Sequence, residues 1–221
     1  REAAQRIGFP LVVKPSGGGG GMGMQVVAHM EDLETALAQA QAVADAAFAN
    51  GGLYLERWIE KPRHIEYQIL ADEHGNAMHL YERECSVQRR HQKLIEESPA
   101  PGIDAQVLRE QAQRGADICA QLGYNNLGTM ETLYSDGDSG FLEMNTRIQV
   151  EHGVTEEVTG IDLVQQQILL SAGADLPDQP SVMKGHAIEV RLYAEEAQTL
   201  RPSTGMLRSF DMPKLFGVRV E

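Results

Sequence analysis

The run from Phe141 to His152 constrains the fold more than any other stretch of this chain. It places polar side chains at every second position, and alternate side chains of an extended segment point to the same face. These positions hold Glu143, Asn145, Arg147, Gln149 and Glu151. A packed interior accepts such an array only when ligands or hydrogen bonds satisfy it. The run therefore predicts a binding site, and the competing interpretation is a solvated edge strand.

Composition and charge limit the classes of function. With 221 residues, 42% of them hydrophobic and 23% charged, the chain is long enough for one large or two small soluble domains. A net charge of −13 opposes broad binding to nucleic acid or to an anionic membrane. No apolar run approaches the roughly 18 residues that span a bilayer. Cys85 and Cys119 lack CxxC and metal-ligand spacing, which predicts two buried thiols in a reducing cytoplasm.

Both ends of the chain have the pattern of interrupted elements. Residues 1–4 resemble the middle of a helix, and residues 218–221 resemble a strand in progress. The chain also starts with Arg1 rather than with Met. We therefore expect a piece of a longer protein.

The hydrophobic periodicity predicts an α+β fold. Strands are expected at residues 11–14, 24–29, 53–59, 64–71, 77–87, 127–134, 140–144 and 186–194. Helices are expected at residues 31–48, 104–122 and 155–172, with Asp104 as an N-cap. Residues 135–139 carry a strong hairpin signal. The strand at residues 77–87 is expected to run into a loop, and a subdomain break is expected near residues 58–63.

Five consecutive glycines, Gly17 to Gly21, lie between two expected strands. Their amides can point at an anion with no Cβ in the way. The dinucleotide fingerprint requires a helix directly after the loop, and a Walker loop requires Gly-Lys-Ser/Thr, so neither fits. The remaining interpretation is a flap over a nucleoside triphosphate, with Lys14 as a phosphate-facing cation. The alternative is a disordered linker.

Glu131 and Glu143 lie on the two strands of the predicted hairpin. An even pairing register, with Tyr134 near position 140 or 142, places both carboxylates on one side of the sheet. Like charges directly opposite each other on paired strands repel, and a divalent cation bound between them would turn this repulsion into a net attraction. Oxygen ligands favour Mg²⁺ or Mn²⁺ over zinc. The alternative is two solvent-facing glutamates.

Basic side chains gather where the strand at residues 77–87 is expected to end: Arg89, Arg90, His91 and Lys93. Such a group can bind phosphate or a small planar anion, because arginine offers bidentate donors and lysine a point charge. Glutamates at positions 82, 84, 96 and 97 leave a surface ion-pair patch as the alternative.

Taken together, these residues resemble the biotin carboxylase component of biotin-dependent carboxylases, members of the ATP-grasp superfamily. The resemblance is carried by VKPSGGGGG at residues 13–21, PRHIE at 62–66, ECSVQRRHQK at 84–93, EMNTRIQVEH at 143–152 and GHAIEVR at 185–191. It implies an ATP-grasp α+β fold, with a glycine-flap lid subdomain at residues 1–58. Residues 59–221 would be part of a larger antiparallel-sheet catalytic subdomain.

The resemblance also implies roles for individual residues. The nucleotide site would comprise Lys14, Gly17, Gly18, Gly19, Gly20, Gly21, Glu56, Arg57, Ile59, His64, Gln88 and His91. Two Mg²⁺ or Mn²⁺ ions would be held by Glu131, Glu143 and Asn145. Bicarbonate would be positioned by Lys93, Arg147, Gln149 and Val150. Glu151 would be the general base, and Arg191 would stabilise the enolate of biotin.

The implied activity is that of a ligase that carboxylates biotin with ATP and bicarbonate through carboxyphosphate. Its implied partners are a biotin carboxyl carrier and a carboxyltransferase, within a homo-oligomer in the cytoplasm, with neither nucleic acid nor membrane as a partner. We expect the 221-residue chain to be inactive by itself. The alternatives are another ATP-grasp ligase similar to carbamoyl phosphate synthetase, which residues 147–152 and Arg191 disfavour, and a non-catalytic nucleotide-binding module. The resemblance does not identify the acyl acceptor that the complete carboxylase would use.

Overall fold

The computed structural model describes residues 1–17, 22–47, 51–180, 182–212 and 215–221. The chain forms two compact units, Arg1–Val190 and Arg191–Glu221. Within the described part of the second unit there is one isolated β-bridge, between Glu195 and Pro202, and no helix or longer strand. The strand expected at residues 218–221 is therefore wrong.

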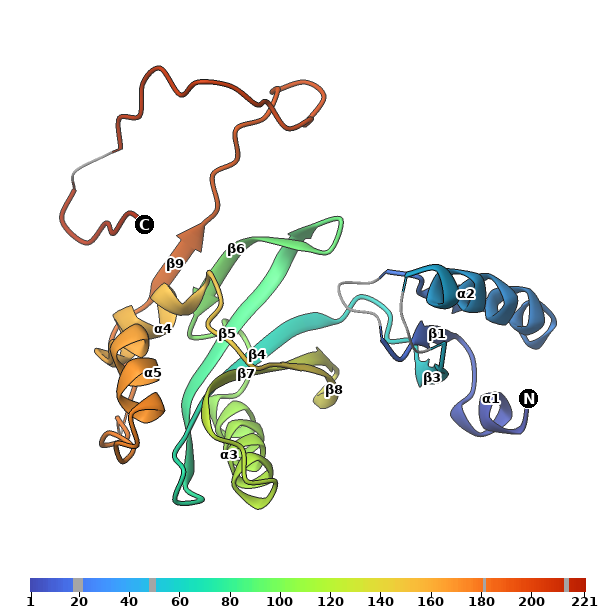
Figure 1. Cartoon of the computed structure of the whole chain (residues 1–221), viewed down its shortest axis with the longest axis horizontal. Coiled ribbons are helices and arrows are strands. Elements are labelled where there is room, and N and C mark those ends of the chain that lie inside the picture. Colours follow the sequence, from blue (N-terminus) through green and yellow to red (C-terminus); the bar gives the residue numbers. More distant parts are fainter. Residues whose placement is uncertain (18–21, 48–50, 181, 213–214) are drawn as a thin grey trace. The chain divides into compact units, whose positions relative to one another are not determined.

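The first unit contains a three-stranded sheet in the order β2-β1-β3, of which Figure 1 labels β1 and β3. Its elements are α1 (Glu2–Ile7), β1 (Leu11–Pro15), β2 (Gln25–Val27), the 3₁₀ turn η1 (Met30–Asp32), α2 (Leu33–Ala47) and β3 (Leu53–Arg57). Both pairings of β1 are antiparallel. The expected strand–loop–strand arrangement and the following helix are confirmed. Leu11 and Val13 of β1 pack with Leu33 and Ala40 of α2, which forms the core of this sheet.

A six-stranded antiparallel sheet in the order β8-β7-β4-β5-β6-β9 forms the larger part of this unit. Its strands are β4 (Arg63–Ala71), β5 (Ala77–Arg89), β6 (Gln92–Ser98), β7 (Asn126–Ser135), β8 (Asp138–Asn145) and β9 (Ala187–Val190). The sequence missed β6. It is joined to β5 by a two-residue turn at Arg90 and His91, with φ of 52° and 63°. Such turns usually carry Asn or Gly, so this one gave no hairpin signal.

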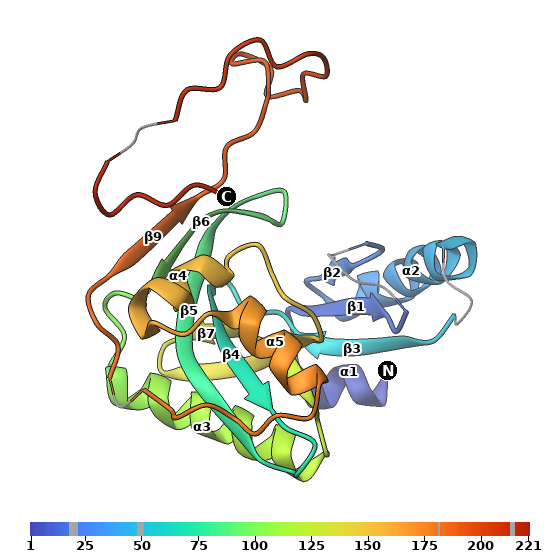
Figure 2. The same ribbon diagram turned by 60° about the vertical axis from the view of Figure 1, so that its left-hand side comes forward.

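Helices cover both faces of the six-stranded sheet (Figure 2). On one face lies α3 (Ala105–Gln121), whose N-cap Asp104 accepts a hydrogen bond from the amide of Gln106, as expected. On the other face lie α4 (His152–Thr159) and α5 (Leu163–Ser171). The single helix expected at residues 155–172 is wrong, because Gly160 adopts a left-handed φ of 75° and ends α4.

Two further expectations concern the membrane and the thiols. None of the helices among the described residues combines the length and the apolar character needed to cross a membrane. Cys85 and Cys119 are free and buried, as predicted.

Candidate active site

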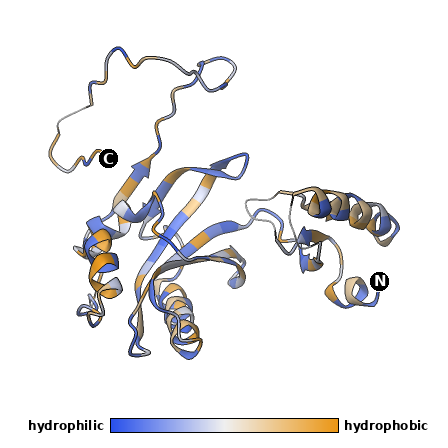
Figure 3. Cartoon of the chain, viewed as in Figure 1, coloured by the Kyte–Doolittle hydropathy of each residue, from blue (hydrophilic) through white to orange (hydrophobic). Residues whose placement is uncertain are grey.

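Polar side chains alternate with apolar ones along β4, although the strand is buried on both faces. His64, Glu66 and Gln68 point to the face covered by α4 and α5, and all three are buried. Figure 3 shows hydrophilic segments within the central strands of the sheet beside hydrophobic ones. Glu66 is completely buried. A buried carboxylate needs partners of opposite charge, so this face predicts a charged network.

Lys93 supplies one such partner from the start of β6. Its Nζ lies 2.5 Å from Glu66 Oε2, 2.8 Å from Glu131 Oε1 and 2.5 Å from Glu151 Oε1. An ammonium group has three donors, and three carboxylates take them all. Burial alone would lower the pKa of Lys93, but the three carboxylates outweigh it and raise the pKa. Lys93 therefore stays charged in this network.

Glu131, on β7, gathers several donors on its two oxygens. Besides Lys93, its Oε1 accepts hydrogen bonds from Asn145 Nδ2 at 3.0 Å and from Gln149 Nε2 at 2.8 Å. Its Oε2 lies 3.1 Å from His64 Nε2. Burial would raise the pKa of Glu131, but the neighbouring His64 and Lys93 more than offset it and lower the pKa to about 2. The carboxylate is thus held in its charged form, which is the form that binds a cation.

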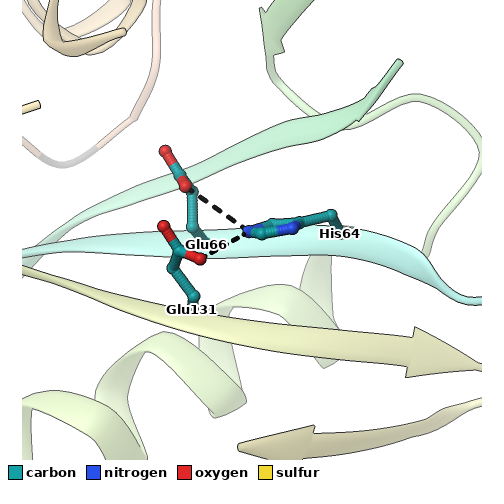
Figure 4. Close-up of side chains that lie close together, drawn as sticks. All are labelled: His64, Glu66 and Glu131. Atoms are coloured by element: carbon teal, nitrogen blue, oxygen red, sulfur yellow. Dashed lines mark ion pairs between the residues drawn. The ribbon is translucent and has the colours of Figure 1, made fainter. Parts of the chain in front are cut away.

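Figure 4 shows one ring nitrogen of His64 facing the carboxylates of both Glu66 and Glu131. The amide nitrogen of Gln88 contacts His64 Nδ1 at 3.0 Å and donates to the carbonyl of Cys85 at 2.8 Å. The other ring nitrogen, Nε2, faces Glu66 and Glu131.

Two residues of this network were not predicted as site residues, Glu66 and Arg83. Arg83 is completely buried on β5, and its Nε donates to Glu66 Oε1 at 2.5 Å. The charges of Arg83 and Lys93 outweigh burial and lower the pKa of Glu66. For Glu66 a signal was present in the sequence, because the carboxylate lies between Ile65 and Tyr67 in an apolar strand, where it must be paired. Arg83 lies between Glu82 and Glu84 and gave no such signal.

Glu131 pairs directly with Glu143 across β7 and β8, as the even register predicted. Nearer the turn the register differs by one residue, with Tyr134 opposite Ser139, and an irregularity after Glu131 restores it. Glu143 is half-buried. Together with the amide oxygen of Asn145, the two carboxylates form the oxygen-only set that Mg²⁺ and Mn²⁺ prefer, and opposed carboxylates favour a cation between them. These residues fit a divalent metal.

His64, Glu66 and Glu131 form a second group whose ligand atoms lie within 4.8 Å of one another. Lys93 Nζ already contacts both carboxylates of this group. An ammonium therefore already supplies positive charge to this group.

The polar run after Phe141 does not continue as a strand, which corrects the alternating-face prediction. Strand β8 ends at Asn145, and α4 begins at His152. The connecting segment nevertheless turns Gln149 and Glu151 inward, where both are buried, and it leaves Val150 exposed.

Arg147 is exposed in the same segment. Its Nη2 donates to Asn145 Oδ1 at 3.3 Å, and its Nη1 donates to the Ile148 carbonyl at 3.1 Å. The segment thus brings Asn145, Gln149 and Glu151 to Lys93 and Glu131, with Arg147 at the solvent side.

Other predicted site residues lie outside this network. Lys14 and Glu56 form an ion pair of 2.8 Å within the three-stranded sheet, where Lys14 also faces the ring of Tyr54. The remaining residues of that region are Arg57, at the end of β3, Ile59, in the following connection, and Gly17, before β2. His91 lies in the exposed turn before β6, and Arg191 begins the second unit. Gly18 to Gly21 fall outside the described residues.

Comparison with known proteins places this arrangement in a family. Residues 1–179 match the family described as carbamoyl-phosphate synthase L chain, ATP binding domain. The chain belongs to this family. The matched residues include every element from α1 through α5.

Individual relatives narrow the comparison further, because their names give a more specific type of protein than the family description does. The chain is 50% identical over 221 residues to a biotin carboxylase of Haemophilus influenzae, covering 99% of this chain and 49% of that protein. A biotin carboxylase–β,γ-ATP complex of Campylobacter jejuni superposes with a TM-score of 0.85 at 46% identity, covering 90% of this chain and 45% of that chain.

A third similar structure is the biotin carboxylase domain dimer of the Hydrogenobacter thermophilus 2-oxoglutarate carboxylase, with MgADP, ADP and bicarbonate. It has a TM-score of 0.91 at 40% identity, covering 99% of this chain and 49% of that one. The predicted resemblance and the ATP-grasp α+β fold are confirmed. The chain spans about half the length of the curated relatives it matches.

Proposed function

We propose that the full-length protein carboxylates biotin with ATP and bicarbonate, the first half-reaction of a biotin-dependent carboxylase. One observation carries the proposal: the Lys93 ammonium contacts both Glu131, a proposed metal ligand, and Glu151, the proposed base. The phosphate groups near Glu131 and the bicarbonate near Glu151 would then both lie close to the Lys93 ammonium. Sequence identity of 50% to a biotin carboxylase supports this chemistry.

Bicarbonate would bind beside Glu151. On the buried side the Lys93 ammonium supplies positive charge and Gln149 an N–H donor, and Arg147 offers a planar pair of donors from the solvent side. The backbone at Val150 completes the anion site. Glu151 takes the bicarbonate proton, and the freed oxygen attacks the γ-phosphorus of ATP, so that carboxyphosphate forms and ADP leaves.

The nucleotide would be held by residues from both sheets. These are Lys14, the glycines at positions 17–21, Glu56, Arg57, Ile59, His64, Gln88 and His91. Two Mg²⁺ or Mn²⁺ ions bound by Glu131, Glu143 and Asn145 would neutralise phosphate charge. Phosphoryl transfer depends mainly on such positioning and charge neutralisation.

Biotin would react in the second step. Carboxyphosphate separates into CO₂ and phosphate, the phosphate removes the ureido N–H proton, and the nitrogen attacks CO₂. Arg191 would stabilise the negative charge on the ureido oxygen. The biotin would arrive on a carboxyl carrier and leave to a carboxyltransferase. We further propose a cytoplasmic homo-oligomer and subdomains at residues 1–58 and 59–221.

Carbamoyl phosphate synthesis is the second candidate, because the family description names it. It uses the same metal and ATP chemistry with another acceptor. Free biotin added to the full-length protein distinguishes the two. Stimulation of bicarbonate-dependent ATP turnover by biotin supports carboxylation, and stimulation by ammonia or glutamine alone supports the second candidate.

The role of Glu151 can be tested by Glu151→Gln in the full-length protein. The change keeps the shape and removes the base, so bicarbonate-dependent ATP turnover should fall by about 10²–10⁴ while ATP affinity stays within about twofold. Steady-state kinetics and ATP titration measure both. Glu110→Gln, which removes an exposed carboxylate from α3, is the control and should have wild-type kinetics. Unchanged turnover in Glu151→Gln would refute the proposed base.

A further inference from the structure

Arg83 is a completely buried arginine with an acceptor for every N–H of its guanidinium group. The five hydrogen bonds run from Nε to Glu66 Oε1 (2.5 Å), from Nη1 to Gln68 Oε1 (2.7 Å) and Thr155 Oγ1 (2.9 Å), and from Nη2 to Thr129 Oγ1 (3.2 Å) and Gln149 Oε1 (3.2 Å). An arginine has five donors in a fixed plane, so this group is fully used and cannot rotate without loss.

The bond to Gln149 decides which way its side-chain amide points. The amide oxygen of Gln149 accepts from Arg83, and the amide nitrogen donates to Glu131 Oε1 at 2.8 Å. The reverse orientation would turn the NH₂ group toward the guanidinium and the oxygen toward the carboxylate. Both contacts would become repulsive, because the NH₂ donors would face the N–H donors of Arg83, and the amide oxygen would face the carboxylate oxygen of Glu131. Arg83 and Glu131 therefore fix the amide between them.

Arg83 also connects the strands to the helix that follows the base. It contacts Glu66 on β4, Thr129 on β7 and Thr155 on α4. Glu151 is the N-cap residue of α4, one helical turn before Thr155. Glu66, in turn, contacts Lys93. Arg83 thus contacts one proposed bicarbonate residue, Gln149, directly and is linked to another, Lys93, through Glu66.

We propose that Arg83 is a positioning residue: with one N–H of the Gln149 NH₂ group donated to Glu131, it orients the second N–H toward bicarbonate. The inference rests on the proposed function, since Gln149 is a bicarbonate contact only in that scheme. Arg83 acts through Gln149 and does not touch the substrate. A lysine at position 83 would keep the positive charge but would lose the planar set of donors that spans Glu66 and Gln149.

The test is Arg83→Lys in the full-length protein. Misorientation of the Gln149 amide weakens one hydrogen bond to an anion, so KM for bicarbonate should rise about tenfold while KM for ATP stays within about twofold. Partial unfolding gives another pattern: it lowers kcat in proportion to the folded fraction and changes neither KM. Bicarbonate and ATP titrations, with a thermal melt of each variant, separate these cases.

Arg63→Lys is the matched control. Arg63 also lies on the six-stranded sheet, and its Nε contacts Glu84 Oε1 at 2.8 Å, away from Gln149. Its KM values should equal those of the wild type. A bicarbonate KM that is unchanged in Arg83→Lys, or equally raised in Arg63→Lys, overturns the proposal. If Arg83→Lys does not fold, Thr129→Val removes an acceptor from the same Nη2 and should raise the bicarbonate KM about twofold to threefold.

A readout independent of activity separates this inference from the proposed function. The Gln149 side-chain NH₂ resonances, assigned by their loss in Gln149→Ala, should be shifted and protected from exchange in the wild type. Arg83→Lys should move them toward the values of exposed glutamines. A wild type without bicarbonate-dependent ATP turnover defeats the proposed function, whereas unmoved amide resonances in Arg83→Lys defeat the positioning role.

Discussion

The two faces of strand β4 are equally buried, yet different forces hold them. On the α3 face, Ile65, Tyr67 and Ile69 are completely buried and pack with apolar residues of that helix. On the opposite face, Glu66 and Gln68 are buried to the same degree and are satisfied by Arg83 and Lys93. One face of β4 therefore packs against apolar side chains, and its other face carries an ionic network.

The comparison shows what each face contributes. Apolar burial stabilises by about 25 cal/mol per Å² and depends weakly on any one neighbour. A buried ion pair gains little net stability, because desolvation offsets the attraction, but loss of one partner leaves the other charge exposed to an apolar interior. The polar face is thus costly to build and sensitive to single changes, which fits a site selected for chemistry.

The largest expected effect is Glu66→Ala on the polar face. It removes the acceptor of Arg83 Nε and one of the three partners of Lys93, so local stability should fall by about 3–5 kcal/mol. Native-state hydrogen exchange of the β4 and β5 amides in the full-length protein measures this loss. On the opposite face, Ile69→Val is the control and should cost about 0.5–1.5 kcal/mol. Equal losses from the two changes would remove the distinction between the faces.

A second effect concerns acid stability and Glu131. Its pKa is lowered from an ordinary value of 4.5 to about 2. A lowered folded-state pKa gives stability that is present above pH 4.5 and is lost as the pH falls toward 2, about 3 kcal/mol in total. Urea unfolding at pH 5, 4 and 3 should show this decline in the wild type and a shallower one in Glu131→Gln. If the free energy of unfolding falls equally with pH in the wild type and in Glu131→Gln, the predicted contribution of Glu131 is wrong.

The smallest effect is expected at the edge of the apolar face. Asp104→Ala removes the N-cap of α3, whose side chain accepts from the Gln106 amide at 2.8 Å. Stability should fall by about 1 kcal/mol, because one helix-end amide loses its acceptor. Asp104→Asn keeps an acceptor and is the control. Thermal melts compare the two, and a loss of bicarbonate binding in Asp104→Ala would show that the two faces are coupled.

Much of the fold could be predicted from local pattern. The strands other than β6, the Asp104 cap and a hairpin that brings Glu131 and Glu143 to one side of the sheet follow from periodicity and turn composition. The irregularity after Glu131, which pairs the two glutamates directly, does not. Strand β6 could not be predicted, because its turn uses Arg90 and His91 at positive φ. The expected strand at residues 140–144 ends within one residue of β8, at Asn145, but the shared face expected for Arg147, Gln149 and Glu151 was wrong, since the chain leaves the sheet there.

The order of amino acids specifies which chemical groups are available: the carboxylates, the lysine, the amide and the helix and strand pattern that carries them. Which of these groups come into contact depends on how the strands pair and how the connections fold back. Lys93 and Glu151 are 58 positions apart, and Arg83 and Gln149 are 66 apart. Their contacts depend on the strand order β7-β4-β5-β6 and on the segment that turns back after β8. Local spacing carries no information on such pairing, because the free energy that selects it comes from burial and charge satisfaction across the whole sheet.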